Sequence, residues 1–172
     1  MLQSLSIFTL PALLIIAATS DFMSLRIPNW LTILTGLLFF PMAYATGLPL
    51  HDFGYHLLAG VILFVLGFLL FQFGLFGGGD AKLMAAAGLW FGTSQVIPFL
   101  VLTALAGGAL ALLIGIWSVF MLSWSFEGDK AMLGGLRDRL ATLKPNIPYG
   151  FALAVGGILA FKDTWWMTTG LS

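Results

Sequence analysis

Cysteine is absent from this chain, and charged residues make up only 8% of its 172 residues. The absence of cysteine excludes disulfides and thiolate zinc sites, and two histidines are too few for a convincing metal centre. The seven basic and seven acidic residues balance, and the basic ones are scattered, so no nucleic-acid surface is indicated. We therefore expect no metal, no cofactor and no nucleic-acid partner.

Apolar residues take the place of the missing charges. Hydrophobic residues account for 60% of the chain, and the mean hydropathy of +1.04 lies far outside the usual soluble composition. A bilayer core needs about 20 apolar residues per helical span, and it excludes open sheets because their backbone groups would stay unpaired. The composition therefore predicts an all-α, multi-pass membrane protein.

The apolar runs and the polar joints between them predict a bundle of six transmembrane helices in one domain, residues 1–172. The fourth run is short for a full span, so we expect a thin or tilted helix buried among the others. No Lys or Arg precedes the first run, which favours a retained helix over a signal peptide. The predicted helices are approximately 4–20, 30–46, 55–75, 80–92, 96–122 and 147–165.

A polar segment, 123–146, separates the last two predicted helices. At 100° per residue its apolar side chains fall on one face, which predicts a short amphipathic helix on the membrane surface. Its basic residues could attract anionic lipid. A solvated linker with incidental leucines is the alternative. The apolar side chains are Met132, Leu133, Leu136, Leu140 and Leu143.

The basic residues predict the orientation of the bundle. Six of the seven Lys and Arg residues lie in the joints 21–29, 76–82 and 123–146, which six alternating spans place on one side. The positive-inside rule makes that side cytoplasmic and leaves both termini outside. Lys162, near the outer end of the last helix, is a mild exception.

Two acidic residues stand out from the rest. Asp21 closes the first predicted helix and Asp80 opens the fourth, both at the cytoplasmic side and at comparable depth. An ionisable residue at such depth is costly and tends to face the bundle interior or a wet cavity, which makes it a functional candidate. The other acids lie in outer segments or in the polar segment, where solvation explains them. They are Asp52, Glu127, Asp129, Asp138 and Asp163.

Three successive glycines, Gly77, Gly78 and Gly79, precede Asp80. They remove side-chain bulk and permit a positive φ, so a substrate backbone can approach the carboxylate, whereas a helix cap would need one glycine at most. Two carboxylates that share a proton can divide the roles, one polarising a water and the other protonating a scissile carbonyl. We therefore predict Asp21 and Asp80 as an aspartyl protease pair, within direct or single-water hydrogen-bond reach.

These residues resemble the motifs of the type IV prepilin peptidases. The stretch 77–80 fits the G-x-G-D signature, and Asp21 is followed six to eight residues later by the sequence Ile-Pro-Asn, 27–29. The stretch 148–150, Pro-Tyr-Gly, also resembles a recurrent motif of that family. G-x-G-D alone is weak and is shared with presenilin-like proteases, but together with the Asp-Ile-Pro-Asn spacing and the chain length it is fairly specific.

The resemblance implies a membrane aspartyl endopeptidase of the bacterial inner membrane. It would cleave the short basic leader of prepilins or pseudopilins at the cytoplasmic face, through an activated water and a tetrahedral gem-diol, without a metal. Larger members carry a cysteine-containing cytoplasmic segment that methylates the new N-terminus, and this chain has no cysteine. It is therefore similar to the short peptidase-only branch of tight-adherence (Flp-type) pilus systems, and we expect no methyl transfer.

Other readings of the charged residues remain open. Lys82 and Arg26 could tune the pair of acids or meet an acidic group of the substrate, or they could be plain positive-inside anchors. Asp80 could instead cap its helix while Asp21 pairs with Arg26 or Lys82. The histidines, His51 and His56, are expected on the outer side, far from the acids.

Two alternative functions also remain. The first is a presenilin-like intramembrane protease with other substrates. The second is a small proton or cation transporter component, which would place its acids nearer the membrane midplane.

Overall fold

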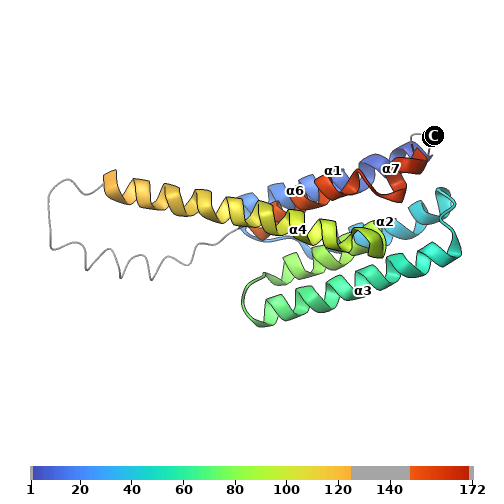
Figure 1. Cartoon of the computed structure of the whole chain (residues 1–172), viewed down its shortest axis with the longest axis horizontal. Coiled ribbons are helices and arrows are strands. Elements are labelled where there is room, and N and C mark those ends of the chain that lie inside the picture. Colours follow the sequence, from blue (N-terminus) through green and yellow to red (C-terminus); the bar gives the residue numbers. More distant parts are fainter. Residues whose placement is uncertain (1, 125–147, 171–172) are drawn as a thin grey trace. The chain divides into compact units, whose positions relative to one another are not determined.

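The computed structural model describes residues 2–124 and 148–170, and this part of the chain contains helices and no strand (Figure 1). The all-α prediction is confirmed for these residues. The predicted surface helix, with Met132 to Leu143, lies outside the described residues. The helices are α1 (Leu2–Ser24), α2 (Asn29–Ala45), α3 (Leu50–Gln72), α4 (Gly78–Trp124), α6 (Tyr149–Phe161) and α7 (Trp165–Gly170).

The helix bounds differ from the expected ones at several places. Helix α1 continues past Asp21 to Ser24, so this acid lies inside the last turn rather than after it. Helix α3 begins at Leu50, so the expected loop before it is shorter. The last expected helix is divided into α6 and α7.

The expected fourth and fifth helices form one element, α4, that Gly92 interrupts. Gly92 has φ 66° and ψ 172°, and the chain reverses its direction there (Figure 1). We had expected the break at 93–95, but the helix resumes directly after the glycine. A positive φ at no steric cost explains why the break falls on the glycine.

Two compact units make up the chain. The first comprises Met1–Gly107 and Pro148–Ser172, and the second comprises Gly108–Ile147. The described part of the second unit is the end of α4, residues 108–124, and it is helical. The contacts of the core and of the candidate site all belong to the first unit.

Several of the helices are long and apolar enough to span a bilayer. Leu5–Ser24, Leu50–Gln72 and Gly78–Met121 meet this condition, while α2 and α6 are apolar but shorter. Large apolar side chains such as Phe8, Ile33 and Val61 are exposed on the helices, which suits contact with lipid and not with water. The chain is a membrane protein. Its orientation, with both termini outside, stays a prediction.

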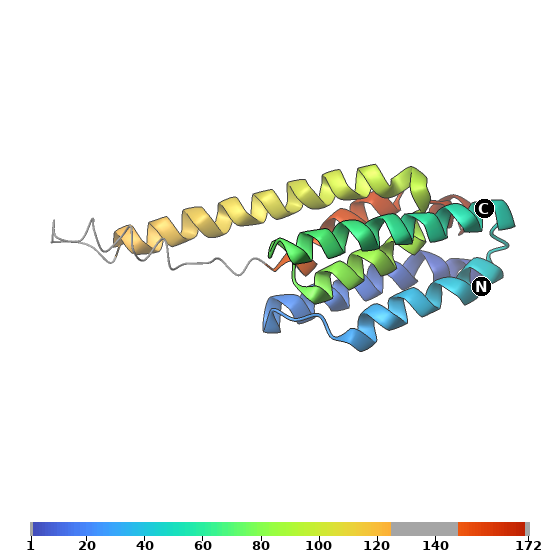
Figure 2. The ribbon, with the colours of Figure 1, turned by 90° about the horizontal axis from the view of Figure 1, so that it is seen from below.

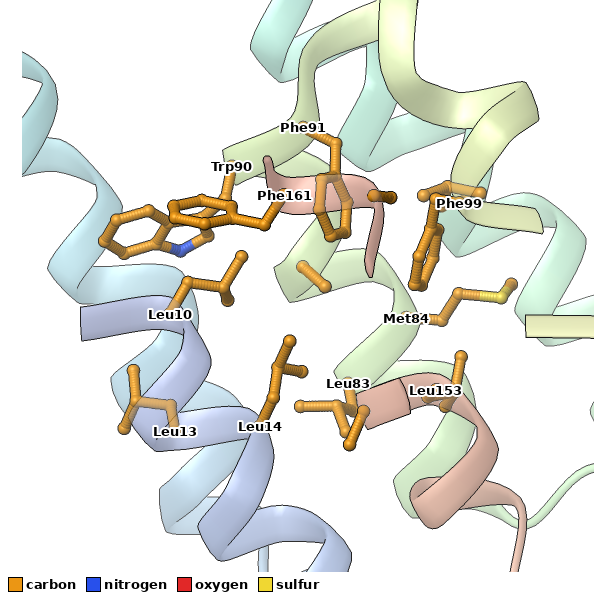
Figure 3. Packing of buried hydrophobic residues seen from close by; sticks show 14 of the residues in the cluster. Leu10, Leu13, Leu14, Leu83, Met84, Trp90, Phe91, Phe99, Leu153 and Phe161 are labelled. Carbon is orange, nitrogen blue, oxygen red and sulfur yellow. The ribbon is translucent and has the colours of Figure 1, made fainter. Parts of the chain in front are cut away.

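The hydrophobic core draws buried side chains from α1, α2, α3, both sections of α4, α6 and α7. Leu10 of α1 lies near Trp90 of α4, and Leu14 of α1 lies near Leu83 of α4 (Figure 3). All four side chains are buried. Helices α1 and α6 also lie side by side (Figure 1), and Figure 2 shows the same bundle from below. This packing brings the end of α1 next to the start of α6.

Side chains from other helices compensate for the break in α4. A helix that stops leaves its last carbonyl oxygens without intrahelical donors. His56 Nδ1 donates to Leu89 O at 2.6 Å, and Trp166 Nε1 donates to Trp90 O at 2.6 Å. A carbonyl oxygen only accepts, so Nδ1 of His56 carries the hydrogen. His56 is therefore accounted for as a structural residue at this break.

Close helix crossing at Gly156 yields a first prediction. A Cβ at Gly156 would lie 2.7 Å from Thr103 Cα, which is backbone and cannot turn away, whereas a Cβ at Gly54 would meet open space. We expect Gly156→Ala to destabilise the protein by about 1–3 kcal/mol through overpacking. We expect Gly54→Ala to be neutral or stabilising by up to about 1 kcal/mol, because alanine favours the helix. Thermal unfolding in detergent measures both, and equal midpoints for the two variants would contradict this packing.

Candidate active site

Asp21 is held by the start of a helix far away in the sequence. Its side chain is only 4% exposed, and Oδ2 accepts a hydrogen bond of 2.7 Å from the backbone N–H of Gly150. The backbone N–H of Phe151 also interacts with this carboxylate. Gly150 and Phe151 lie in the first turn of α6, where N–H groups have no intrahelical partner and favour an anion. Asp21 thus joins the end of α1 to the start of α6.

The chain turns sharply directly after Asp21. Leu25 adopts φ 51°, the left-handed region, and its N–H donates to Asp21 O at 2.7 Å. The hydroxyl groups of Ser20 and Ser24 both donate to Arg26 O, at 3.0 Å and 3.2 Å. A left-handed leucine costs about 1–2 kcal/mol. These hydrogen bonds help to hold the turn in that conformation and aim the following residue, Ile27, back toward the bundle.

Asp80 lies in the first turn of α4 and is 7% exposed. Its Oδ2 accepts a hydrogen bond of 3.0 Å from the backbone N–H of Gly77, whose own Cβ would lie 2.9 Å from that oxygen. Its Oδ1 is buried and has no hydrogen-bond partner in the described part of the chain. A buried polar atom without a partner is costly and needs an explanation. Capping of α4 explains only one of the two oxygens.

Ile27 lies between the two acids. A Cβ on Gly79, the residue before Asp80, would lie 3.0 Å from Ile27 Cβ and 3.1 Å from Ile27 O. A Cβ on Gly150 would lie 2.8 Å from Ile27 Cδ1. One buried side chain therefore contacts both the residue that precedes Asp80 and the residue that binds Asp21. The structure brings the two acids to the same end of the bundle.

The two carboxyl groups lie on either side of Ile27, and no hydrogen bond between them is observed in the part of the chain that the structure describes. Ile27 packs against Gly79, which precedes Asp80, and against Gly150, which binds Asp21. Since Asp80 Oδ1 has no partner and Oδ2 accepts from Gly77, no direct hydrogen bond joins Asp80 to Asp21 in the described residues. Each carboxylate instead accepts a hydrogen bond from a backbone N–H, Asp80 from Gly77 and Asp21 from Gly150.

Aromatic packing joins the glycine stretch to α6. The rings of Phe76 and Tyr149 have centroids 5.0 Å apart at an angle of 37°. The sequence predicted the stretch 148–150 only as a motif and did not indicate that its Gly150 binds Asp21. The start of the helix could have indicated it, because a proline followed by an apolar run predicts free N–H groups that attract a carboxylate.

Arg26 and Lys82 form no ion pair with Asp21 or Asp80 in the part of the chain that the structure describes. Lys82 Nζ donates to Asn29 Oδ1 at 2.9 Å and so connects the first turn of α4 to the first turn of α2. Arg26 is exposed. The reading in which Asp21 pairs with Arg26 or Lys82 is therefore not observed. His51 lies apart, exposed and 3.4 Å from Asp52.

The site has the chemistry of a carboxylate pair. Within residues 2–124 and 148–170, no three His, Asp or Glu side chains gather as metal ligands would. Two buried carboxyl groups, one with an unpaired oxygen, lie beside a glycine stretch that presents backbone rather than side chains. Such a pair can accept and donate protons to a water and to a carbonyl group that enters between them.

Comparison with known proteins identifies one family. Residues 8–112 match the family model described as the type IV leader peptidase family, and this range includes both Asp21 and Asp80. No curated protein and no solved structure matches the chain.

The position of Ile27 yields a second prediction. Because Ile27 is buried against Gly79 and Gly150, we expect Ile27→Ala to lower the free energy of unfolding by about 2–5 kcal/mol and Ile27→Val by about 0.5–1.5 kcal/mol. Ile33→Ala is the matched control, since Ile33 is 58% exposed and should change stability by less than about 0.5 kcal/mol. Denaturant unfolding in mixed micelles measures all three. A loss at Ile33 as large as that at Ile27 would refute the buried contact.

Proposed function

The chain belongs to the type IV leader peptidase family, and from this premise we propose that Asp21 and Asp80 are its catalytic pair. Family membership makes the protein a membrane peptidase of the leader peptidase type. The finer assignment, an aspartic endopeptidase that removes the basic leader of prepilins or pseudopilins, is our proposal.

One observation carries the proposal: Asp80 is buried with one carboxylate oxygen unpaired, beside a second buried carboxylate. A protein that used both acids for stability alone would pair every oxygen, because an unpaired buried polar atom costs about 1–3 kcal/mol. Unpaired, perturbed groups at a buried site are typical of functional sites. The unpaired oxygen is where a water would bind.

The mechanism follows from the arrangement of the two carboxyl groups. A water held at Oδ1 of Asp80 gives a proton to the ionised member of the pair as its oxygen attacks the scissile carbonyl. The protonated member gives its proton to the carbonyl oxygen, which forms a neutral gem-diol. Breakdown of the gem-diol breaks the C–N bond, and a proton passes to the leaving nitrogen. The hydrogen bonds from Gly77 and Gly150 keep both carboxylates in position throughout.

The glycine stretch supplies room for the substrate. Gly77 and Gly79 already have neighbouring atoms at 2.9 Å and 3.0 Å from where a Cβ would be, so any side chain there would displace Asp80 or Ile27. A bare backbone lets an extended peptide approach Asp80 closely. The proposed peptide is the leader junction of a prepilin, reached from the cytoplasmic face of the bacterial inner membrane.

The transporter alternative fits less well. Transporters place their ion-binding acids near the middle of the membrane, at broken helices. Here Asp21 lies in the last turn of α1 and Asp80 in the first turn of α4, while the break at Gly92 lies at the other end of that helix section. The placement of both acids at helix ends supports a peptidase that meets its substrate at the membrane edge.

Replacement of either acid by its amide gives a third prediction. Asn keeps the shape of the side chain and its oxygen can still accept the N–H of Gly77 or Gly150, so the fold should persist. We expect Asp21→Asn and Asp80→Asn each to lower the rate of leader removal by about 10²–10⁴-fold, the usual contribution of acid–base groups. Co-expression with a prepilin and a gel shift of the substrate measures the rate.

Asp52→Asn is the matched control, because the Asp52 side chain is 44% exposed and lies in the first turn of α3, among residues with no part in the site. We expect this variant to process the prepilin at the wild-type rate. If Asp21→Asn or Asp80→Asn processes the prepilin at the wild-type rate, the two acids are not the catalytic pair.

The lack of cysteine supports a fourth prediction, that the protein cleaves without methylating its product. We expect the mature pilin released by this protein alone to have an unmodified N-terminal amine. Mass spectrometry of the N-terminal peptide, with S-adenosylmethionine supplied in excess, measures this. A product heavier by one methyl group would overturn the peptidase-only assignment and leave the catalytic pair unaffected.

A further inference from the structure

An apolar groove lies between α1 and α6 and begins beside Asp21. Its volume is about 400 Å³. Small side chains, Ala18 and Ala154, lie between larger ones that are more exposed. The lining residues are Ile15, Ala18, Thr19, Phe22, Phe151, Ala154, Val155 and Ile158.

One end of the groove is lined by the residues that follow Asp21 and Gly150 in the chain. Phe22 directly follows Asp21, and Phe151 directly follows Gly150, whose N–H binds that acid. The end of α1 thus faces the start of α6, so the two helices run in opposite directions. From Phe22 to Ile15 the groove follows α1 away from Asp21 for about 10 Å, or two helical turns. A ligand in the groove therefore has one end near Asp21.

No polar group in the groove is free to bind a ligand. The one polar side chain in its lining, Thr19, donates its hydroxyl to Ile15 O at 2.8 Å. The α1 wall is also part of a helix that is long and apolar enough to span the membrane. An extended peptide would leave its backbone groups unpaired there, whereas a helix pairs its own. A peptide that occupies the groove must therefore be helical and apolar.

We propose that this groove docks an apolar helical segment of the substrate, with the scissile bond at the end of that segment beside Asp21. The inference rests on the proposed function. Small residues such as Ala18 and Ala154 let another helix approach closely, and the larger side chains on either side match the ridges-into-grooves packing of helices. The substrate helix lies along α1 and α6 and unwinds only at the acids, where the glycine stretch leaves room for an extended backbone.

Disulfide trapping tests the docking directly, because the chain has no cysteine of its own. Thr19→Cys and Ile158→Cys are each combined with Asp80→Asn, so that the substrate stays uncut. The probe is a prepilin whose only cysteine is moved stepwise along its apolar helix. After oxidation in membranes, we expect cross-links at substrate positions spaced three or four residues apart, one face of a helix.

Ile33→Cys on α2 and Ile62→Cys on α3 are the controls, since both side chains are exposed and lie outside the groove. We expect no cross-link from either. Equal cross-linking from control and groove positions, or none from the groove, overturns the docking site.

A groove-filling variant separates substrate from lipid as the occupant. We expect Ala18→Leu to raise KM for the prepilin about tenfold or more with kcat changed far less, the sign of lost substrate binding. Ala104→Leu is the matched control, an exposed alanine on α4 outside the groove. Unchanged KM in Ala18→Leu would mean that lipid fills the groove, and the proposal would fail.

The same assays distinguish the two proposals. If the parent chain cleaves the single-cysteine prepilin but the groove positions do not cross-link, only the docking site is wrong. If the parent chain does not cleave it, the proposed function fails and the docking site fails with it.

Discussion

A single buried hydrogen bond, from the backbone N–H of Gly150 to Oδ2 of Asp21, connects the parts of the chain that build the site. A carboxylate buried to this extent needs donors, and the first turn of a helix has N–H groups without partners. Because α6 meets this need, the end of α1 and the start of α6 must lie together. The turn at Leu25 then returns the chain to the bundle, so that Ile27 reaches both Gly150 and Gly79.

Glycine makes these approaches possible. At Gly79 and Gly150 an added Cβ would lie 3.0 Å or less from Ile27, and at Gly150 it would also lie 2.8 Å from Asp21 Oδ2. The end of α1, the start of α4 and the start of α6 can therefore pack closely around Ile27. The cost is the conformational entropy of ordering glycines, which the buried contacts around Ile27 must offset. In the proposed function, the lack of side chains in the glycine stretch also lets a substrate backbone approach Asp80.

The opposite end of the first section of α4 is held in a different way. Gly92 breaks the helix, and N–H groups from His56 and Trp166 take the place of the lost intrahelical donors. Phe39 packs against both rings, at centroid distances of 5.6 Å and 6.0 Å. Here His56 and Trp166 each donate to a carbonyl oxygen that the break exposes, whereas at the acids Oδ1 of Asp80 has no hydrogen-bond partner in the described residues. The hydrogen bonds of His56 and Trp166 are explained by the break in the helix, and the unpaired oxygen of Asp80 is not explained by its helix.

The amino-acid sequence by itself determined the membrane class, the helical architecture and the choice of Asp21 and Asp80, because hydropathy and motif spacing are local properties of the chain. It did not indicate that α1 continues past Asp21, that Gly92 is the point of reversal, or that Lys82 bonds to Asn29. Nor could it identify Ile27 as the contact between the acids, or the groove of α1 and α6. Each of these depends on a contact between residues distant in the chain. Only the packing of the helices decides which backbone groups, distant in the chain, lie close enough to form a hydrogen bond with a side chain or to leave no room for a larger one.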